Sequence, residues 1–138
     1  MDVAIVRMTA ERASLLDRIA KGVFNAVPVP TLRDAYLASL ASIMVVALDG
    51  DLVVGQVKAA IHLHPDKLAD LSVDEVGVAA THQRRGIARR MLGEVEQWAR
   101  ERGCADVWLA AEVDNEAARS LYDSFAESKP AILYFWDL

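Results

Sequence analysis

The sequence has little cysteine, proline or glycine. Of its 138 residues, one is cysteine, four are proline and seven are glycine, while 54% are hydrophobic. The single cysteine, Cys104, excludes an internal disulfide and a metal site built on paired cysteines. A chain this apolar and this rarely interrupted is not a disordered one. We therefore expect residues 1–138 to form a single domain.

Long apolar runs and excess positive charge are also missing. The longest apolar stretches, such as Ile43–Leu48 and Leu52–Val57, are far shorter than the ~20 residues that cross a bilayer, and no basic stretch leads into a signal-like apolar core. We expect a soluble, cytoplasmic protein that does not bind membranes. The formal net charge of −5 disfavours nucleic acid as a partner and favours a cationic small molecule, such as an amine.

The apolar patterns predict alternating strands and helices. Asp49-Gly50-Asp51 between two β-rich runs is a strong hairpin signal. Six apolar residues recur at helical spacing from Ile87, and Gly103 ends that helix. An exposed loop is expected over His64–Ser72. The predicted strands are Val3–Met8, Ile43–Leu48, Leu52–Leu63, Val73–Ala80, Ala105–Val113 and Ile132–Trp136. Two further helices are predicted over Ala10–Gly22, with Thr9 as its N-cap, and over Thr31–Leu40. A last helix is capped by Asp114 or Asn115, and its apolar face includes Tyr122 and Phe125.

This order, β-α-α-β-β-β-α-β-α-β, predicts an α/β (α+β) domain in which helices flank a mixed β-sheet. We found no internal repeat, linker or low-complexity segment in the sequence.

The turn between the strand ending at Ala80 and the long helix carries the clearest chemical signal. A helix N-terminus presents unbonded N–H groups and a positive dipole end, which together bind anions. Gly86 and Ala88 leave the N–H groups of Arg84–Ala88 accessible to a pyrophosphate, and the Arg84 and Arg85 side chains add charge-assisted bonds. The glycine patterns of nucleoside-triphosphate and dinucleotide loops are missing. The turn therefore predicts a phosphate site of another kind.

Two motifs resemble those of the GNAT superfamily of N-acetyltransferases. Gln83-Arg-Arg-Gly-Ile-Ala88 is similar to the family's Gln/Arg-x-x-Gly-x-Gly/Ala motif, with Val76 and Val78 on the preceding strand in the expected places. Asn115-Glu-Ala-Ala-Arg-Ser-Leu-Tyr122 is similar to its Asn-x-x-Ala-x-x-Leu-Tyr helix. Within the superfamily, the chain looks most like the aminoglycoside 3-N-acetyltransferases. It departs from the family at Ala126-Glu127, where a Gly-Phe usually follows the tyrosine helix.

The resemblance implies acetyl-CoA as co-substrate and assigns roles to several residues. The family's cofactor site corresponds to Val76, Val78, Gln83, Arg84, Arg85, Gly86, Ile87, Ala88 and Asn115. The backbone of Val78 is expected to bind the pantetheine arm, and its N–H to polarise the thioester carbonyl. Tyr122 is expected to protonate the departing thiolate. Each of these residues also has a purely structural alternative: Val78 as an ordinary core valine, Tyr122 as a packed aromatic residue, and Asn115 as a simple helix cap.

An attacking amine must lose a proton, so a general base is needed. Glu75 is our first candidate because it lies three residues before Val78; Asp137, Glu112 and Asp114 are the alternatives, and each is also a plausible solvated carboxylate. His62 and His64 share a face of a strand end, but no third ligand follows at a clear spacing, so we expect no metal.

The leading hypothesis is therefore direct transfer of an acetyl group from acetyl-CoA to the primary amine of a small molecule, without an acyl-enzyme. A non-catalytic acetyl-CoA-binding or structural module is one alternative, and an acyltransferase for protein N-termini is another. The apolar segment Ala131–Trp136 is available as the interface of a homodimer.

Overall fold

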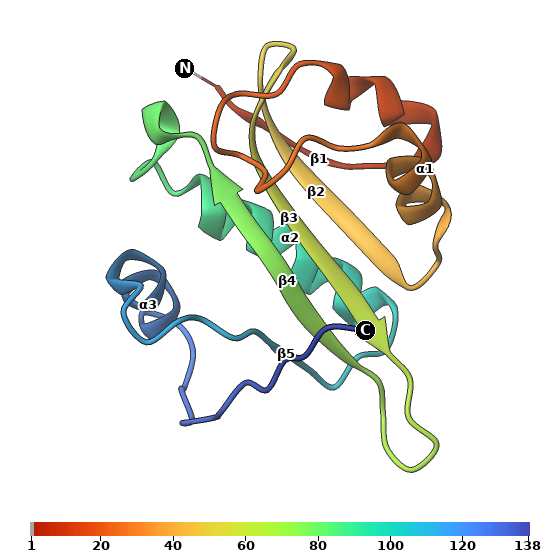
Figure 1. Ribbon diagram of the computed structural model, residues 1–138, viewed down its shortest axis with the longest axis vertical. Coiled ribbons are helices and arrows are strands. Elements are labelled where there is room, and N and C mark those ends of the chain that lie inside the picture. Colours follow the sequence, from red (N-terminus) through yellow and green to blue (C-terminus); the bar gives the residue numbers. More distant parts are fainter. Residues whose placement is uncertain (1) are drawn as a thin grey trace.

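The computed structural model describes residues 2–138, and its centre is a five-stranded sheet in the order β1-β2-β3-β4-β5 (Figure 1). Strands β1 to β4 are antiparallel neighbours, and β5 runs parallel to β4. The strands are β1 (Ala4–Arg7), β2 (Ser42–Asp49), β3 (Leu52–His62), β4 (Asp70–Val78) and β5 (Asp106–Trp108). The predicted mixed α/β architecture is confirmed.

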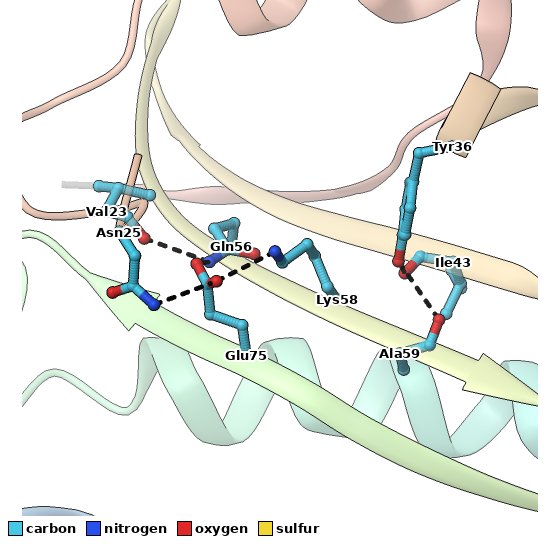
Figure 2. Close-up of polar contacts among 8 residues, drawn as sticks. All are labelled: Val23, Asn25, Tyr36, Ile43, Gln56, Lys58, Ala59 and Glu75. Atoms are coloured by element: carbon cyan, nitrogen blue, oxygen red, sulfur yellow. Dashed lines mark hydrogen bonds and ion pairs between the residues drawn. The ribbon is translucent and has the colours of Figure 1, made fainter. Parts of the chain in front are cut away.

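Helix α2 (Ile87–Glu101) covers one face of this sheet, while the 3-10 helix η1 (Ala10–Asp17) and helix α1 (Pro30–Ala38) lie against the other (Figure 1). The Tyr36 hydroxyl of α1 donates to the Ile43 carbonyl at 2.6 Å (Figure 2). Two further elements, η2 (Ala80–His82) and α3 (Glu116–Asp123), flank the sheet. The buried residues of α2 are the six that its apolar spacing predicts, Ile87, Met91, Leu92, Val95, Trp98 and Ala99.

The predicted hairpin is also confirmed. Gly50 adopts a left-handed φ of 63° in the turn between β2 and β3, a conformation that glycine reaches without strain. Val45, Val46, Val53 and Val57 in these strands are fully buried. The hairpin therefore forms the centre of the hydrophobic core.

The first predicted helix, Ala10–Gly22, is wrong in type and length. The structure has a 3-10 helix that ends at Asp17, and Thr9 makes no side-chain cap bond. The reason lies in β3: Val53 donates its N–H to the Arg18 carbonyl and accepts a bond from the Ala20 N–H, each at 2.9 Å. Backbone that pairs with a strand cannot continue a helix.

Strand β4 begins at Asp70 rather than Val73, so the predicted loop His64–Ser72 is too long. Asp70–Ser72 pair with both β3 and β5, which makes them part of the sheet although Asp70 and Ser72 are polar. The strand predicted over Ala105–Val113 is reduced to Asp106–Trp108, because its pairing with β4 ends at Ser72.

The final predicted strand, Ile132–Trp136, is wrong: residues 127–138 have no regular secondary structure. A strand needs a hydrogen-bonded neighbour, which an apolar sequence does not supply by itself. No helix in residues 2–138 combines the length and apolar character needed to cross a membrane.

Candidate active site

Strand β4 has an open backbone edge near its C-terminal end. The Ala79 N–H donates to the Val54 carbonyl of β3 at 2.8 Å. Alternate residues of an antiparallel strand turn their backbone groups to opposite sides, so Val76 and Val78 turn theirs away from β3. On that side, the pairing with β5 covers only Asp70–Ser72. The N–H groups of Val76 and Val78 therefore lack a strand partner among residues 2–138.

The chain after β4 is anchored to the end of the sheet. The buried His82 ring has Nε2 2.8 Å from Asp49 Oδ2 and Nδ1 2.7 Å from Thr81 Oγ1. The Gln83 side-chain amide donates to the Val78 carbonyl at 3.1 Å. These contacts hold the start of the following loop against the open end of β4.

The predicted phosphate loop, residues 83–88, contains two residues with left-handed backbone. Arg84 and Gly86 adopt left-handed φ values of 62° and 76°, and α2 begins directly afterwards. The Arg90 N–H donates to the Gly86 carbonyl at 3.1 Å, which is the first hydrogen bond of the helix. The N–H groups of residues 87–89 precede it and have no acceptor within the helix. The N-cap residue Gly86 has no side chain that could cap this end of α2. The free N–H groups and the helix dipole favour a bound anion.

Helix α3 brings Tyr122 toward the beginning of α2. Asn115 caps α3 by accepting from the Ala118 N–H at 3.1 Å, which confirms its predicted capping position. The Arg89 guanidinium of α2 lies 4.2 Å from the ring centroid of Phe125, and Phe125 meets Tyr122 edge to face at 6.3 Å. Tyr122 is half-buried, and its burial raises the pKa of the phenol. The phenol therefore stays protonated at neutral pH.

Glu75 lies on the opposite face of the sheet from α2, within a polar cluster that joins three segments (Figure 2). The Lys58 ammonium lies 3.0 Å from Glu75 Oε1, which also accepts from the Asn25 amide at 3.4 Å. The Gln56 amide donates to Glu75 Oε2 at 2.5 Å. A carboxylate has about four acceptor positions, so these three donors leave Glu75 one further position.

The chain between η1 and α1 crosses β4 directly beside this cluster. The Val23 carbonyl accepts from Gln56 at 3.2 Å, and a Cβ built on Gly77 would lie only 2.0 Å from that oxygen. Gln56 is fully buried, and its Oε1 has no hydrogen-bond partner within residues 2–138. Sequence reasoning missed Asn25, Gln56 and Lys58; a glutamine inside the apolar run of β3 was the available signal.

The remaining candidates lie elsewhere. Glu112, Asp114 and Asp137 are exposed and form no side-chain hydrogen bonds among the described residues. His62 bonds to Ser72 at 2.8 Å and stacks on Trp108, and His64 contacts Asp70. Hydrogen bonds from His64 and then Trp108 lower the pKa of Asp70. No group of three possible metal ligands lies together in residues 2–138.

Comparison with known families identifies the family of the chain. Residues 12–126 match the model of the acetyltransferase (GNAT) family. The chain therefore belongs to the GNAT family of acetyltransferases. None of the curated proteins compared matches its sequence.

Solved structures agree with this assignment. An aminoglycoside acetyltransferase from an uncultured soil metagenomic sample has a TM-score of 0.86 at 19% identity, over 100% of this chain and 99% of the other. The acetyltransferase AAC(6')-Iy, bound to the bisubstrate analogue CoA-S-monomethyl-acetylneamine, has a TM-score of 0.84 at 14% identity, covering 100% and 99%. A ribosomal-protein-alanine N-acetyltransferase from Brucella melitensis biovar Abortus 2308 has a TM-score of 0.75 at 21% identity, covering 99% of each chain.

Proposed function

We propose that the protein transfers the acetyl group of acetyl-CoA to a primary amine of a small molecule, by direct attack in a ternary complex. The observation that carries this proposal is the position of the open β4 edge directly before a loop with two left-handed residues and a helix N-terminus. Backbone donors at Val76 and Val78 suit the pantetheine arm, and residues 83–88 suit the pyrophosphate. The CoA-based analogue bound to AAC(6')-Iy supports this choice of co-substrate.

In the proposed reaction, the amine nitrogen attacks the thioester carbonyl carbon and the carbon–sulfur bond breaks. The Val78 N–H stabilises the negative charge that develops on the carbonyl oxygen. The amine proton passes to Glu75, directly or through water, and the Tyr122 hydroxyl protonates the CoA thiolate. No metal takes part in this scheme.

Glu75 suits the role of base because of its position and its free acceptor site. Its side chain is 16% exposed, so the cluster around it is open to an acceptor on one side. Lys58, Gln56 and Asn25 orient the carboxylate and leave one acceptor position for an amine N–H or a water. This arrangement favours Glu75 over the exposed Asp137, Glu112 and Asp114.

A small cationic acceptor agrees with the net charge of −5. The neighbours named as aminoglycoside acetyltransferases support this class of acceptor, whereas the ribosomal-protein-alanine acetyltransferase supports an alternative, a protein N-terminus. These neighbours are only 14–21% identical to this chain, so they show its fold, and both acceptor classes remain proposals. The likeness to 3-N-acetyltransferases stays a prediction.

A screen of acceptors, read by release of the CoA thiol, tests the proposal. Polyamines, aminoglycosides, amino acids and peptides with free N-termini are supplied with acetyl-CoA. We expect turnover with small amines. Turnover with peptides alone would favour the protein N-terminal alternative, and acetyl-CoA binding without turnover of any acceptor would favour the non-catalytic module.

Replacing the base tests the role of Glu75. We expect Glu75→Gln to lower kcat/KM for the best amine by at least about 100-fold, the usual lower range for loss of a general base, with acetyl-CoA affinity unchanged. Asp137→Asn is the matched control, because Asp137 is an exposed carboxylate next to the C-terminal residue. A loss of activity in Asp137→Asn, with Glu75→Gln active, would assign the base to Asp137 instead.

A further inference from the structure

Lys58 places a primary amine directly beside the proposed base. Its ammonium nitrogen lies 3.0 Å from Glu75 Oε1 (Figure 2). A general base takes a proton from a group within about 2.6–3.2 Å, so Lys58 meets the distance that an acceptor amine has to meet. The protein thus carries an amine of the proposed acceptor class at its own proposed site.

The register of the sheet holds these two side chains together. Lys58 of β3 pairs with Glu75 of β4. The next pair along the strands joins Ala59 to Val73, so Asp74 is an extra residue in β4. Without this bulge Glu75 would share the buried face of Val73, because alternate residues of a strand face the same side. The bulge therefore turns the carboxylate to the face that carries the lysine.

The Lys58 amine lies over the strand that is proposed to bind the thioester. Its nitrogen contacts a side chain of β4, although Lys58 itself belongs to β3. Val76 follows Glu75 directly, and its N–H has no strand partner among residues 2–138 on the outer side of β4. Neighbouring strands lie about 4.7–4.9 Å apart, so the width of one strand separates the amine from the proposed path of the pantetheine arm. The flexible four-carbon stem of lysine covers a distance of this size.

Lys58 differs from the other lysines of the chain. Lys21, Lys67 and Lys129 are exposed and form no ion pair among residues 2–138, whereas Lys58 is paired and its side chain is only 31% exposed. Acetyl-CoA that reacts from free solution meets exposed amines most often, so unassisted acetylation should favour the other three lysines. Preferential acetylation of Lys58 would therefore require the site around it.

We propose that the protein acetylates its own Lys58, with acetyl-CoA as the donor. This inference rests on the proposed function, because it uses the same base and the same general acid. Glu75 accepts a proton from the Lys58 nitrogen, and the freed lone pair attacks the thioester carbonyl carbon. A carbon–nitrogen bond forms, the carbon–sulfur bond breaks, and Tyr122 protonates the CoA thiolate. The ammonium nitrogen loses two protons in all: one balances the proton given to sulfur, and the other leaves through Glu75 to water.

Acetylation changes the proposed acceptor site as well as the lysine. An acetylated lysine carries no charge, so its ion pair with Glu75 ends. The hydrogen bonds that Gln56 and Asn25 donate to the carboxylate do not involve the lysine. Glu75 therefore stays oriented and gains an acceptor position for an amine from solution. The reaction takes place once in each molecule and opens the base to the outside acceptor.

Peptide mapping by mass spectrometry of the purified full chain, incubated with saturating acetyl-CoA, tests this proposal. The readout is the acetylated fraction of each lysine, including any acetyl group present at isolation. We expect Lys58 to be acetylated at least about tenfold faster than Lys21, Lys67 or Lys129, because proximity favours it. The rate should not change when the protein is diluted, and the preference should disappear in concentrated urea. Acetylation that follows exposure, with Lys58 the slowest, overturns the proposal, and so does a rate at Lys58 that falls on dilution.

Glu75→Gln separates catalysed from unassisted acetylation. We expect this variant to acetylate Lys58 at least about tenfold more slowly, as for loss of a general base, with the other lysines unchanged. Unassisted acetylation would not slow down, because glutamine leaves the amine without its ion-pair partner. Lys67→Arg, at an exposed lysine, is the control and should leave the rate at Lys58 unchanged. Equal rates at Lys58 in Glu75→Gln and the parent would contradict the proposal.

The acceptor screen distinguishes the failure of this inference from the failure of the proposed function. A chain that acetylates small amines while its Lys58 stays unmodified overturns self-acetylation and leaves the proposed function intact. A chain that acetylates neither Lys58 nor any amine overturns both. Acetylation of Lys58 without turnover of any small amine would support self-acetylation and contradict the proposed small-molecule acceptor.

Discussion

The two ends of β4 share the same neighbour on one side and differ on the other. Asp70–Ser72 pair with β3 and β5, whereas Val76 and Val78 pair with β3 alone. Leu71 at the paired end is fully buried, and Val78 at the open end is only partly buried. Paired backbone stabilises the fold, while unpaired backbone at the edge of a core needs another partner. One strand therefore serves the fold at its beginning and the proposed site at its end.

The largest expected effect comes from obstructing the phosphate loop beside the open end. Gly86→Val should reduce acetyl-CoA affinity by about 1,000-fold, or ~4 kcal/mol, because a branched side chain occupies the space of the phosphate and strains a φ of 76°. The measurement is titration calorimetry with acetyl-CoA.

Gly103→Val separates obstruction from backbone strain. Gly103 has the same φ of 76° and equally open surroundings, but it lies beyond the other end of α2. We expect this variant to bind acetyl-CoA as the parent does. If both variants bound normally, the phosphate loop would have no role in binding acetyl-CoA.

A somewhat smaller effect is expected where Val23 crosses the open end of β4. Gly77→Ala should lower the free energy of unfolding by about 3 kcal/mol, in the range of overpacked sites, because its Cβ would collide with the Val23 carbonyl. Gly93→Ala is the control: Gly93 lies within α2 with no atom near its Cβ position, and alanine there should stabilise by roughly 1 kcal/mol. Urea unfolding measures both. An unchanged midpoint in Gly77→Ala would mean that Val23 does not lie against β4.

The smallest of these effects concerns the chemical step. Tyr122→Phe should lower kcat about 100-fold, or ~2.7 kcal/mol, and leave acetyl-CoA affinity nearly unchanged. Burial raises the pKa of Tyr122 above its ordinary value of 10.0, so the protonated phenol is lost only as the pH rises above 10. Any decline in kcat caused by this group should therefore begin there. Tyr134→Phe, at an exposed tyrosine, is the control. If Tyr122→Phe and the parent had equal kcat, Tyr122 would not be the general acid and its role would be packing alone.

The elements with local sequence signals were predictable, whereas the paired end of β4, Asp70–Ser72, was predicted as part of a loop. The hairpin β2–β3 and helix α2 carry local signals, Asp49-Gly50 in one and a regular apolar spacing in the other, and the structure has both. The turn before α2 was also predictable, because Gly86 stands between a strand and a long helix. In each case, residues close in sequence determine the structure.

What escaped prediction depends on contacts between distant parts of the chain. The pairing of Arg18 and Ala20 with Val53 ended the first helix early, and no local pattern encodes that contact. The polar cluster joins Asn25, Gln56 and Glu75 from three segments. The end of the chain has strand composition but no strand partner, so its pattern alone could not determine its structure.

The most direct test of the central claim is nuclear magnetic resonance of the backbone amides with and without acetyl-CoA. The account predicts large shifts and slower hydrogen exchange at Val76 and Val78 and at residues 84–88, with Asp70–Ser72 nearly unchanged. Acetyl-CoA binding that leaves Val76 and Val78 unaffected would contradict the claim that the open end of β4 receives the co-substrate.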